Sequence, residues 1–286
     1  MNKTADNQDI KLISYPVLNQ FDEILNFTTT RTGGVSAGSY GTLNLSSNSG
    51  DDLKKVITNR EILLEKTKIA KDRMILPFQT HSYSVLLIDE DFLASDLLRQ
   101  NEKLNGVDAL ITNIPGVCIA VSTADCVPVL LYDPVNKAIA SVHAGWKGTC
   151  TRIATHTVNL MKEAFGTNPK DLVATIGPSI SPDVYEVGAE LIDAFVHAGF
   201  DVKKIFAQRK GKIYLNLWRA NKDILLDNGV DESNIEVSGL CTYSEPDMFF
   251  SARRSGINSG RMLTGIMLRE HKSKLSRIFS SSLSIS

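Results

Sequence analysis

The chain has 286 residues, of which 43% are hydrophobic, and its 31 basic and 32 acidic side chains give a formal net charge of −1. This length and apolar content suffice for one sizeable core. The balanced charge, with no long run of one sign, argues against a general nucleic-acid binder and fits a small-molecule enzyme better.

The N-terminal region carries no sign of a secretory signal, because residues 1–10 are polar and lack an apolar segment. The most apolar stretch, 117–132, is interrupted by Asp125 and Pro128 and is too short to span a bilayer. The four cysteines are far apart and form no CxxC pair, so reduced thiols are expected. We therefore expect a cytoplasmic protein without a membrane partner.

Strands dominate the prediction for the centre of the chain. A first short strand is expected at 85–88, and turn signals such as Ile114-Pro115-Gly116 separate the apolar, β-branched runs that follow. Those runs predict strands at 107–111, 117–121, 127–132 and 138–142. Their close spacing favours antiparallel hairpins or a mixed sheet, since strict β-α-β winding needs a helix between strands.

Helices are predicted after residue 151. Ala154, Val158, Met161 and Phe165 repeat at helical spacing, and Gly166 is expected to end that helix. Further helices are predicted at 188–198 and 217–228, and further strands at 173–176, 213–217 and 235–238.

The order of these elements predicts the α+β fold class, as a single domain in which mixed or antiparallel sheets are layered with helices. No repeat or linker divides the chain. The expected organisation is a disordered N-terminus at 1–10, a single catalytic domain at 11–272, and a frayed, serine-rich tail at 273–286.

Three residues near strand ends form a candidate metal site. His81 precedes a predicted strand, Cys126 lies in a polar break between two strands, and His143 follows a strand. A rigid sheet can direct such side chains to one point. Imidazole and thiolate are the donors that zinc prefers, and three protein ligands leave the open position of a catalytic site. The spacing alone leaves a core role open for Cys126.

The remaining histidines and cysteines have less specific contexts. Cys118 lies inside an apolar strand and is expected in the core, whereas Cys150 and Cys241 lie in polar segments expected to be loops. The other histidines are expected at the surface: His156, His197 and His271.

Basic residues near glycine-rich segments are candidate anion ligands, because arginine forks match phosphate geometry. The loop at 30–36 is no P-loop, and a plain surface turn and a backbone anion site stay equally open for it. The candidates are Arg31 in that loop, Lys147 close to His143, and Arg253 and Arg254, with Arg261 beyond them.

Eight segments in order give the chain a family resemblance: 30–36, 43–45, 79–82, 108–112, 124–128, 143–149, 176–180 with 185–187, and 249–254. The chain resembles the laccase-domain family, long named multicopper polyphenol oxidase and now described as purine nucleoside phosphorylases. The resemblance implies zinc ligands at His81, Cys126 and His143, with Cu²⁺ as the second candidate ion. It also makes Asn44 a candidate substrate ligand, and it implies an α+β fold similar to that of certain toxin deamidases with a Cys-His pair.

The activities implied by the resemblance are phosphorolysis of adenosine, inosine, guanosine and methylthioadenosine, deamination of adenosine, and oxidation of phenols. Purine nucleosides and inorganic phosphate are then the expected partners, and a monomer is expected. A full multicopper set needs roughly ten histidines, whereas the chain has five. Laccase chemistry is therefore the weaker alternative.

Deamination leaves the proton carrier open, because the usual zinc-deaminase signature of His-x-Glu and Pro-Cys-x-x-Cys is absent. Asp125, beside Cys126, is the candidate, and it can equally orient a ligand. Two alternatives from other classes remain. One is a Cys-His hydrolase or deamidase with Cys126 as nucleophile, and the other is a module that binds a metabolite without changing it.

Overall fold

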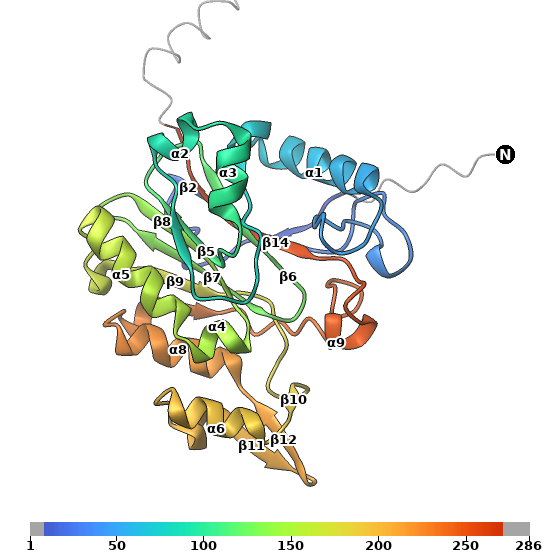
Figure 1. The fold of residues 1–286 in the computed structure, drawn as a ribbon, viewed down its shortest axis with the longest axis vertical. Helices are drawn as coiled ribbons and strands as arrows, with labels where there is room; N and C mark the ends of the chain where they lie inside the picture. The colour runs from blue at the N-terminus through green and yellow to red at the C-terminus, as the bar shows by residue number, and fades with distance from the viewer. Residues whose placement is uncertain (1–8, 271–286) are drawn as a thin grey trace, which may run out of the picture.

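Two stacked β-sheets form the centre of the computed structural model, which describes residues 9–270 (Figure 1). The larger sheet has the strand order β13-β9-β7-β8-β5-β4. Its inner pairs are antiparallel, whereas β13 pairs with β9 and β4 with β5 in parallel. The bounds are β4 (Val85–Leu87), β5 (Ala109–Thr112), β7 (Val127–Asp133), β8 (Ala138–Ala144), β9 (Val173–Ile176) and β13 (Ile235–Val237).

The second sheet has five strands in the order β1-β2-β14-β6-β3, all antiparallel except the pair β3–β6. Its strands are β1 (Leu12–Ile13), β2 (Ile24–Thr29), β3 (Met74–Ile75), β6 (Cys118–Thr123) and β14 (Met262–Leu268). A small antiparallel sheet of β10 (Glu186–Val187), β12 (Lys212–Leu215) and β11 (Phe206–Arg209) extends from the lower end of the molecule (Figure 1).

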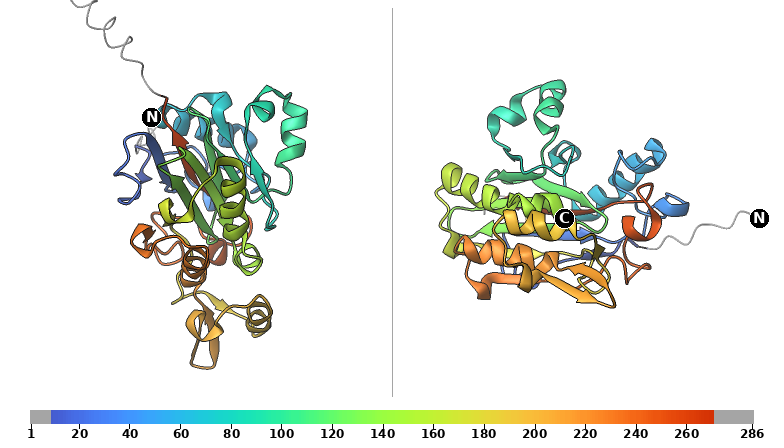
Figure 2. Two further views of the ribbon diagram at one scale, coloured as in Figure 1. Left: turned by 90° about the vertical axis from the view of Figure 1, so that its left-hand side faces the viewer. Right: turned by 60° about the horizontal axis from the view of Figure 1, so that its bottom comes forward.

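Helices lie around the sheets, some against the two large sheets and others beside the small one (Figure 2). They are α1 (Leu53–Thr67), α2 (Glu90–Ala94), α3 (Leu97–Leu104), α4 (Trp146–Cys150), α5 (Ile153–Phe165), α6 (Glu190–His197), α7 (Val202–Ile205), α8 (Leu217–Asp227) and α9 (Ala252–Ser255). Side chains of α5 and α8 share a core with the outer face of the six-stranded sheet, and Leu63 of α1 packs with Phe27 and Leu263 of the other sheet. The expected α+β layering is confirmed.

The core between the sheets follows from the alternation of side chains along each strand. Leu130 of β7 and Ile139 of β8 meet Ile119 of β6 and Ile266 of β14. The neighbours of Leu130 in β7 point the other way, toward α5 and α8.

The segment at 124–126 carries the chain from one sheet to the other, because β6 ends at Thr123 in the five-stranded sheet and β7 begins at Val127 in the six-stranded one. Asp125 in this segment has φ 91°, a left-handed conformation unusual for a non-glycine residue. The hairpin expected from close spacing is correct for β7–β8 and wrong for β6–β7, because β6 pairs with β14 and β3 instead of β7.

The predicted limits of the domain, residues 11 and 272, can be compared with the described residues at each end of the chain. Ile10 is buried against the core of the five-stranded sheet, one residue before the predicted start of the domain. The predicted disorder of residues 1–8, the frayed tail at 273–286 and the surface position of His271 lie outside the described residues. Within residues 9–270, no helix has the length and apolar character needed to cross a membrane.

Candidate metal centre

Asp108 organises the loop that carries His81. This carboxylate is fully buried just before β5, and it accepts hydrogen bonds from the backbone N–H groups of Thr80, His81 and Ser82 at 2.8–3.1 Å. These bonds hold the loop in a tight bend in which His81 has φ 63°. The imidazole of His81 is therefore directed by a carboxylate 27 residues away.

The same carboxylate orients His143, the next-to-last residue of β8. Oδ1 of Asp108 lies 2.6 Å from Nδ1 of His143, and both side chains are almost completely buried. This contact leaves Nε2 of His143 as the nitrogen free to bind an ion. A carboxylate behind a histidine is the usual support of a protein metal ligand.

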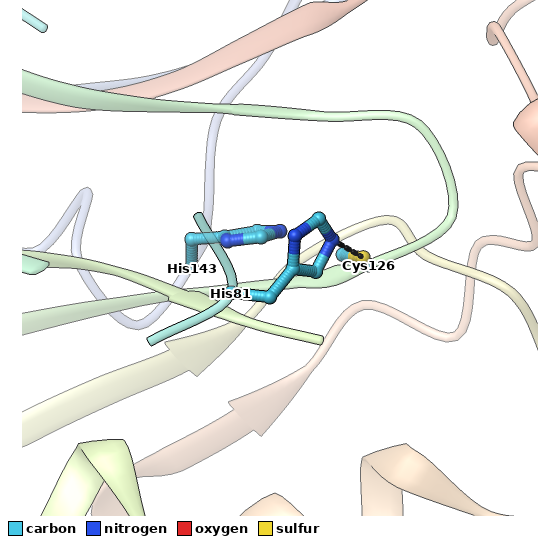
Figure 3. A group of neighbouring side chains, drawn as sticks. All are labelled: His81, Cys126 and His143. Atoms are coloured by element: carbon cyan, nitrogen blue, oxygen red, sulfur yellow. Dashed lines mark hydrogen bonds between the residues drawn. The ribbon is translucent and has the colours of Figure 1, made fainter. Parts of the chain in front are cut away.

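Cys126 completes the group from the crossing between the two sheets. Its Sγ lies 3.8 Å from Nε2 of His81, and the rings of His81 and His143 are 4.9 Å apart in an edge-to-face arrangement (Figure 3). The three side chains come from different parts of the chain and converge on one point, as predicted.

This group can hold a metal ion, since its three donor atoms lie within 4.8 Å of one another. Zinc bonds of about 2.0–2.3 Å at tetrahedral angles place nitrogen and sulfur ligands about 3.6 Å apart, close to the observed 3.8 Å. Gly145 leaves room beside the donors, because a Cβ there would lie 2.9 Å from Sγ of Cys126 and 3.2 Å from Cδ2 of His81.

The electrostatics favour a thiolate at Cys126. Burial alone would raise the pKa of this thiol, but His143 and His81 lower it to about 6. Burial likewise disfavours the charged form of His143, yet the Cys126 thiolate and Asp108 raise its pKa to about 9. For Asp108, burial opposes ionisation, and the hydrogen bonds from His143, Ser82 and Thr80 still hold its pKa below the ordinary value. Cys118, by contrast, lies in an apolar setting that raises its pKa to about 12.

The hydrogen bonds of Asp125 fit the positioning role that the sequence left open beside proton transfer. Its carboxylate accepts hydrogen bonds from Oγ1 of Thr242 at 2.7 Å, from Oγ of Ser251 at 3.1 Å and from the backbone N–H of Arg253 at 2.6 Å. Asp125 thus connects the segment of Cys126 to the start of α9.

The donor group opens into a cavity of about 670 Å³, a volume typical of small-molecule sites. Arg253 lies over the ring of Tyr185, 5.1 Å from its centroid, and donates to the carbonyl of Glu186. Phe78 and Ile257 expose 48% and 79% of their surface although they line the same cavity. Its walls include His81, Cys126, His143, Asp125, Arg253, Arg261, Gln79, Phe78, Tyr185 and Ile257.

Four predicted substrate or phosphate ligands do not line this cavity. The guanidinium of Arg31 donates to the carbonyls of Gly41 and Pro246, and that of Arg254 lies over the ring of Tyr243. Asn44 is fully buried, and its amide binds Ser49 and Asp51 within the fold. Lys147 is exposed on α4 above Trp146. Of the basic candidates, Arg253 and Arg261 do line the cavity.

The glycine-rich loop at 30–36 is packed rather than open to an anion. The backbone N–H of Gly34 donates to Thr42, and that of Val35 to Asn59. A Cβ on Gly34 would lie 2.4 Å from the carbonyl oxygen of Thr42, so glycine is needed for this close approach. Two of the backbone donors that the anion-site interpretation required are therefore occupied.

The other cysteines and histidines largely follow the predictions. Cys118 is in the core, and His156 and His197 are exposed. The prediction of a polar loop at Cys150 is wrong, because Cys150 is the last residue of α4 and packs against the main core. Cys241 is buried in an irregular segment, where its sulfur accepts hydrogen bonds from the backbone.

Two residues of the site had no role in the predictions from sequence: Asp108 and Gly145. A charged residue inside an apolar strand signals a buried partner, and this signal was present at Asp108. The space that Gly145 leaves has no local signal, because it depends on Cys126 and His81, which are distant in the sequence.

A family model described as multi-copper polyphenol oxidoreductase laccase matches residues 25–269. The chain belongs to this family. The resemblance inferred from the eight segments is thereby confirmed.

Relatives and solved structures agree with this placement. The chain is 44% identical to a protein of Bacteroides thetaiotaomicron named purine nucleoside phosphorylase, over 92% of this chain and 98% of that protein. It is 42% identical to adenosine deaminase RL5 from an unknown prokaryotic organism, over 84% and 92% of the two chains. The crystal structure of the Bacillus licheniformis hypothetical protein YfiH matches with a TM-score of 0.83 at 34% identity, over 92% of this chain and 98% of that one.

Proposed function

We propose that this chain is a zinc-dependent purine nucleoside phosphorylase for adenosine, inosine, guanosine and methylthioadenosine, with adenosine deamination as a second activity. The observation that carries the proposal is the convergence of His81, Cys126 and His143 at the wall of a 670 Å³ cavity that two arginines also line. The names of the two relatives support the choice of substrate.

A zinc ion held by these three residues would supply Lewis-acid stabilisation of charge beside the substrate. Asp108 has the supporting role, since it fixes both the loop of His81 and the ring of His143. Such support typically changes metal affinity by about 10- to 100-fold.

The phosphate would lie against Arg253 and Arg261, the arginines of the cavity wall. Asp125 holds the backbone of Arg253 in place, and carbonyls at 257–260 hold the guanidinium of Arg261. Cations fixed in advance are suited to a doubly charged nucleophile.

In the proposed reaction, a phosphate oxygen forms a bond to the anomeric carbon while the bond from that carbon to the purine nitrogen breaks. The purine leaves with the electron pair and takes up a proton. The sugar passes through an oxocarbenium-like state, which the phosphate anion stabilises. The apolar side chains of Phe78 and Ile257 at the cavity suit a flat base.

The deciding experiment is incubation of the purified protein with adenosine, with and without phosphate, followed by chromatography. Adenine and ribose 1-phosphate that appear only with phosphate support phosphorolysis, and inosine supports deamination. Neither product from a protein that contains stoichiometric zinc rejects both purine activities. Unchanged binding of adenosine would then favour the metabolite-binding alternative.

A Cys-His hydrolase is the second candidate, because the pKa of about 6 at Cys126 fits a nucleophile beside a histidine. The two proposals differ in their response to metal. Activity that is lost on chelation and restored by zinc supports the phosphorylase, whereas activity that persists without metal and is lost on alkylation supports the hydrolase.

Copper-dependent phenol oxidation stays a weaker alternative. Within residues 9–270 one group of three or more candidate ligands was found, and it holds two of the chain's five histidines. The proposal of a zinc-dependent phosphorylase also includes four expectations from the sequence. They are zinc as the ion, a fold similar to that of toxin deamidases, a monomeric state and a cytoplasmic location.

A further inference from the structure

A second cavity, of about 540 Å³, adjoins the one that contains the donor group. The two cavities share walls at the loop that precedes His81 and at the segment after Asn44. The shared residues are Ser46, Asn48, Pro77, Phe78, Gln79 and Ser122.

The loop between the cavities is rigid. Phe78 forms backbone hydrogen bonds with Leu104 and Gly106. The side-chain amide of Gln79 donates to the carbonyl of Ser122 at 2.9 Å and accepts from its backbone N–H at 2.7 Å. The shape of the second cavity is therefore set by the fold and not by the arrival of a ligand.

Arg60 of α1 lines this cavity with an incompletely paired guanidinium. Its Nε donates to the carbonyl of Leu45 at 2.9 Å, and Leu45 lines the same cavity. Among residues 9–270, no carboxylate lies within 4.0 Å of Arg60, and its two terminal nitrogens donate to no protein acceptor. Burial lowers the pKa of Arg60 without a compensating acidic neighbour.

An arginine held in this way keeps two terminal nitrogens available for an anionic ligand. The walls around Arg60 offer further donors from the side-chain amides of Asn48, Asn101 and Asn105. Glu102 also lines the cavity, but it lies beyond ion-pair distance of Arg60. A planar fork beside several uncharged donors is the arrangement that recognises phosphoryl oxygens.

We propose that the second cavity binds a phosphoryl group through the guanidinium of Arg60. The group comes either from free inorganic phosphate or from a ligand that reaches across the shared wall. A nucleoside 5′-monophosphate is such a ligand, with its nucleoside part in the cavity of the metal centre, and this second source rests on the proposed function.

The test is calorimetric titration of the zinc-loaded protein in phosphate-free buffer, where phosphorolysis cannot occur. The probes are inorganic phosphate, inosine and inosine 5′-monophosphate. The variants are Arg60→Met, which removes the charge, and Asn101→Asp, which puts a carboxylate on an exposed position of the same cavity and does not endanger folding. Arg99→Met on α3 is the matched control, because Arg99 is exposed and lines neither cavity.

We expect both variants to weaken binding of the phosphoryl ligand about tenfold or more, while Arg99→Met and the affinity for inosine stay unchanged. An effect on inorganic phosphate identifies the free anion as the source, and an effect confined to the monophosphate identifies the tethered group. Equal affinities of the wild type and both variants for phosphate and for the monophosphate would overturn the proposal.

The outcomes separate this proposal from the proposed function. If inosine neither binds nor yields hypoxanthine with phosphate, the proposed function fails, while the titration with inorganic phosphate still tests Arg60. If inosine is cleaved normally and Arg60→Met alters no affinity, the second cavity is not a phosphoryl site.

Discussion

Oδ1 of Asp108 lies 2.6 Å from Nδ1 of His143, and the same carboxylate receives three backbone N–H groups from the loop of His81. One buried acid thus sets the orientation of two of the three candidate metal ligands. Asp108→Asn replaces one acceptor oxygen by an NH₂ group, which cannot accept the hydrogen bonds from His143 or from the backbone N–H groups of the His81 loop. We expect metal affinity to fall about 10- to 100-fold, as measured by competition with a chromogenic chelator.

The matched control is Asp133→Asn. Asp133 is the last residue of β7, at the end of the strand opposite Cys126. Asp133 is equally buried and accepts from the turn at Val135 and Asn136, so its replacement should lower the melting temperature and leave metal affinity intact. If both variants lose metal to the same degree, Asp108 acts through general stability rather than through orientation.

Cys126→Ala removes the sulfur donor and should abolish both stoichiometric zinc and phosphorolysis. Two histidines alone hold zinc weakly, since structural and catalytic sites use at least three protein ligands. Elemental analysis together with the chromatographic assay checks this prediction. Cys150→Ala, at a half-buried cysteine outside the cavity, should keep both properties. Full activity of Cys126→Ala would exclude the proposed centre.

Gly145→Ala should reduce metal affinity and turnover with little effect on stability. The backbone of Gly145, at φ −64°, suits alanine, but the new methyl group would lie 2.9 Å from Sγ of Cys126. Gly166→Ala should instead lower stability and leave the metal site unchanged. Gly166 has φ 70°, which is strained for alanine, and no atom lies within 4 Å of the added Cβ. That variant should cost about 1 kcal/mol of unfolding free energy and keep its metal.

Phe78→Ala should raise KM for adenosine about tenfold and leave KM for phosphate unchanged. Stacking of a base on an aromatic ring contributes about 1–3 kcal/mol, and Phe78 exposes 48% of its surface at the cavity. Initial rates at varied nucleoside and phosphate concentrations check this. Leu97→Ala is the control, since Leu97 is 77% exposed and lies outside the cavity of the metal centre. Equal KM values for wild type and Phe78→Ala would place the base elsewhere.

Cys126 should be the first thiol alkylated once the metal has been removed. Its pKa is lowered to about 6, so the reactive thiolate predominates above pH 6 and is lost as the pH falls below that value. Cys118, with a pKa of about 12, stays protonated throughout. Peptide mapping after iodoacetamide treatment between pH 5 and pH 8 tests the order, and added zinc should protect Cys126. Alkylation of Cys126 that proceeds equally at pH 5 and pH 8 would contradict the assignment.

Local patterns were sufficient for single elements of this fold. The strand at 173–176 matches its prediction, and the helix closed by Gly166 does so within two residues at its start. The partition of β6 and β7 into different sheets was not predictable in this way, because β6 pairs with β14 about 145 residues away. The strands β2 and β14 were also missed.

In the site, too, residues in recognisable motifs could be predicted, whereas roles that depend on contacts distant in the sequence could not. His81, Cys126 and His143 were assigned from motifs that a family resemblance connects. Arg31 and Lys147 were chosen for their charge, yet their surroundings direct them away from the cavity. Charge is visible in a sequence, whereas the carbonyls that bind a guanidinium depend on tertiary structure.

The position of Cys126 in the crossing between the sheets gives the metal a second consequence. An ion shared with His81 and His143 would tie the end of this crossing to β8 and to the loop before β4, so metal binding and the order of the crossing become linked. Cells starved of that ion would then hold a chain that is both inactive and short-lived. Faster proteolysis of the chelated protein at the 124–126 segment is the signature to look for.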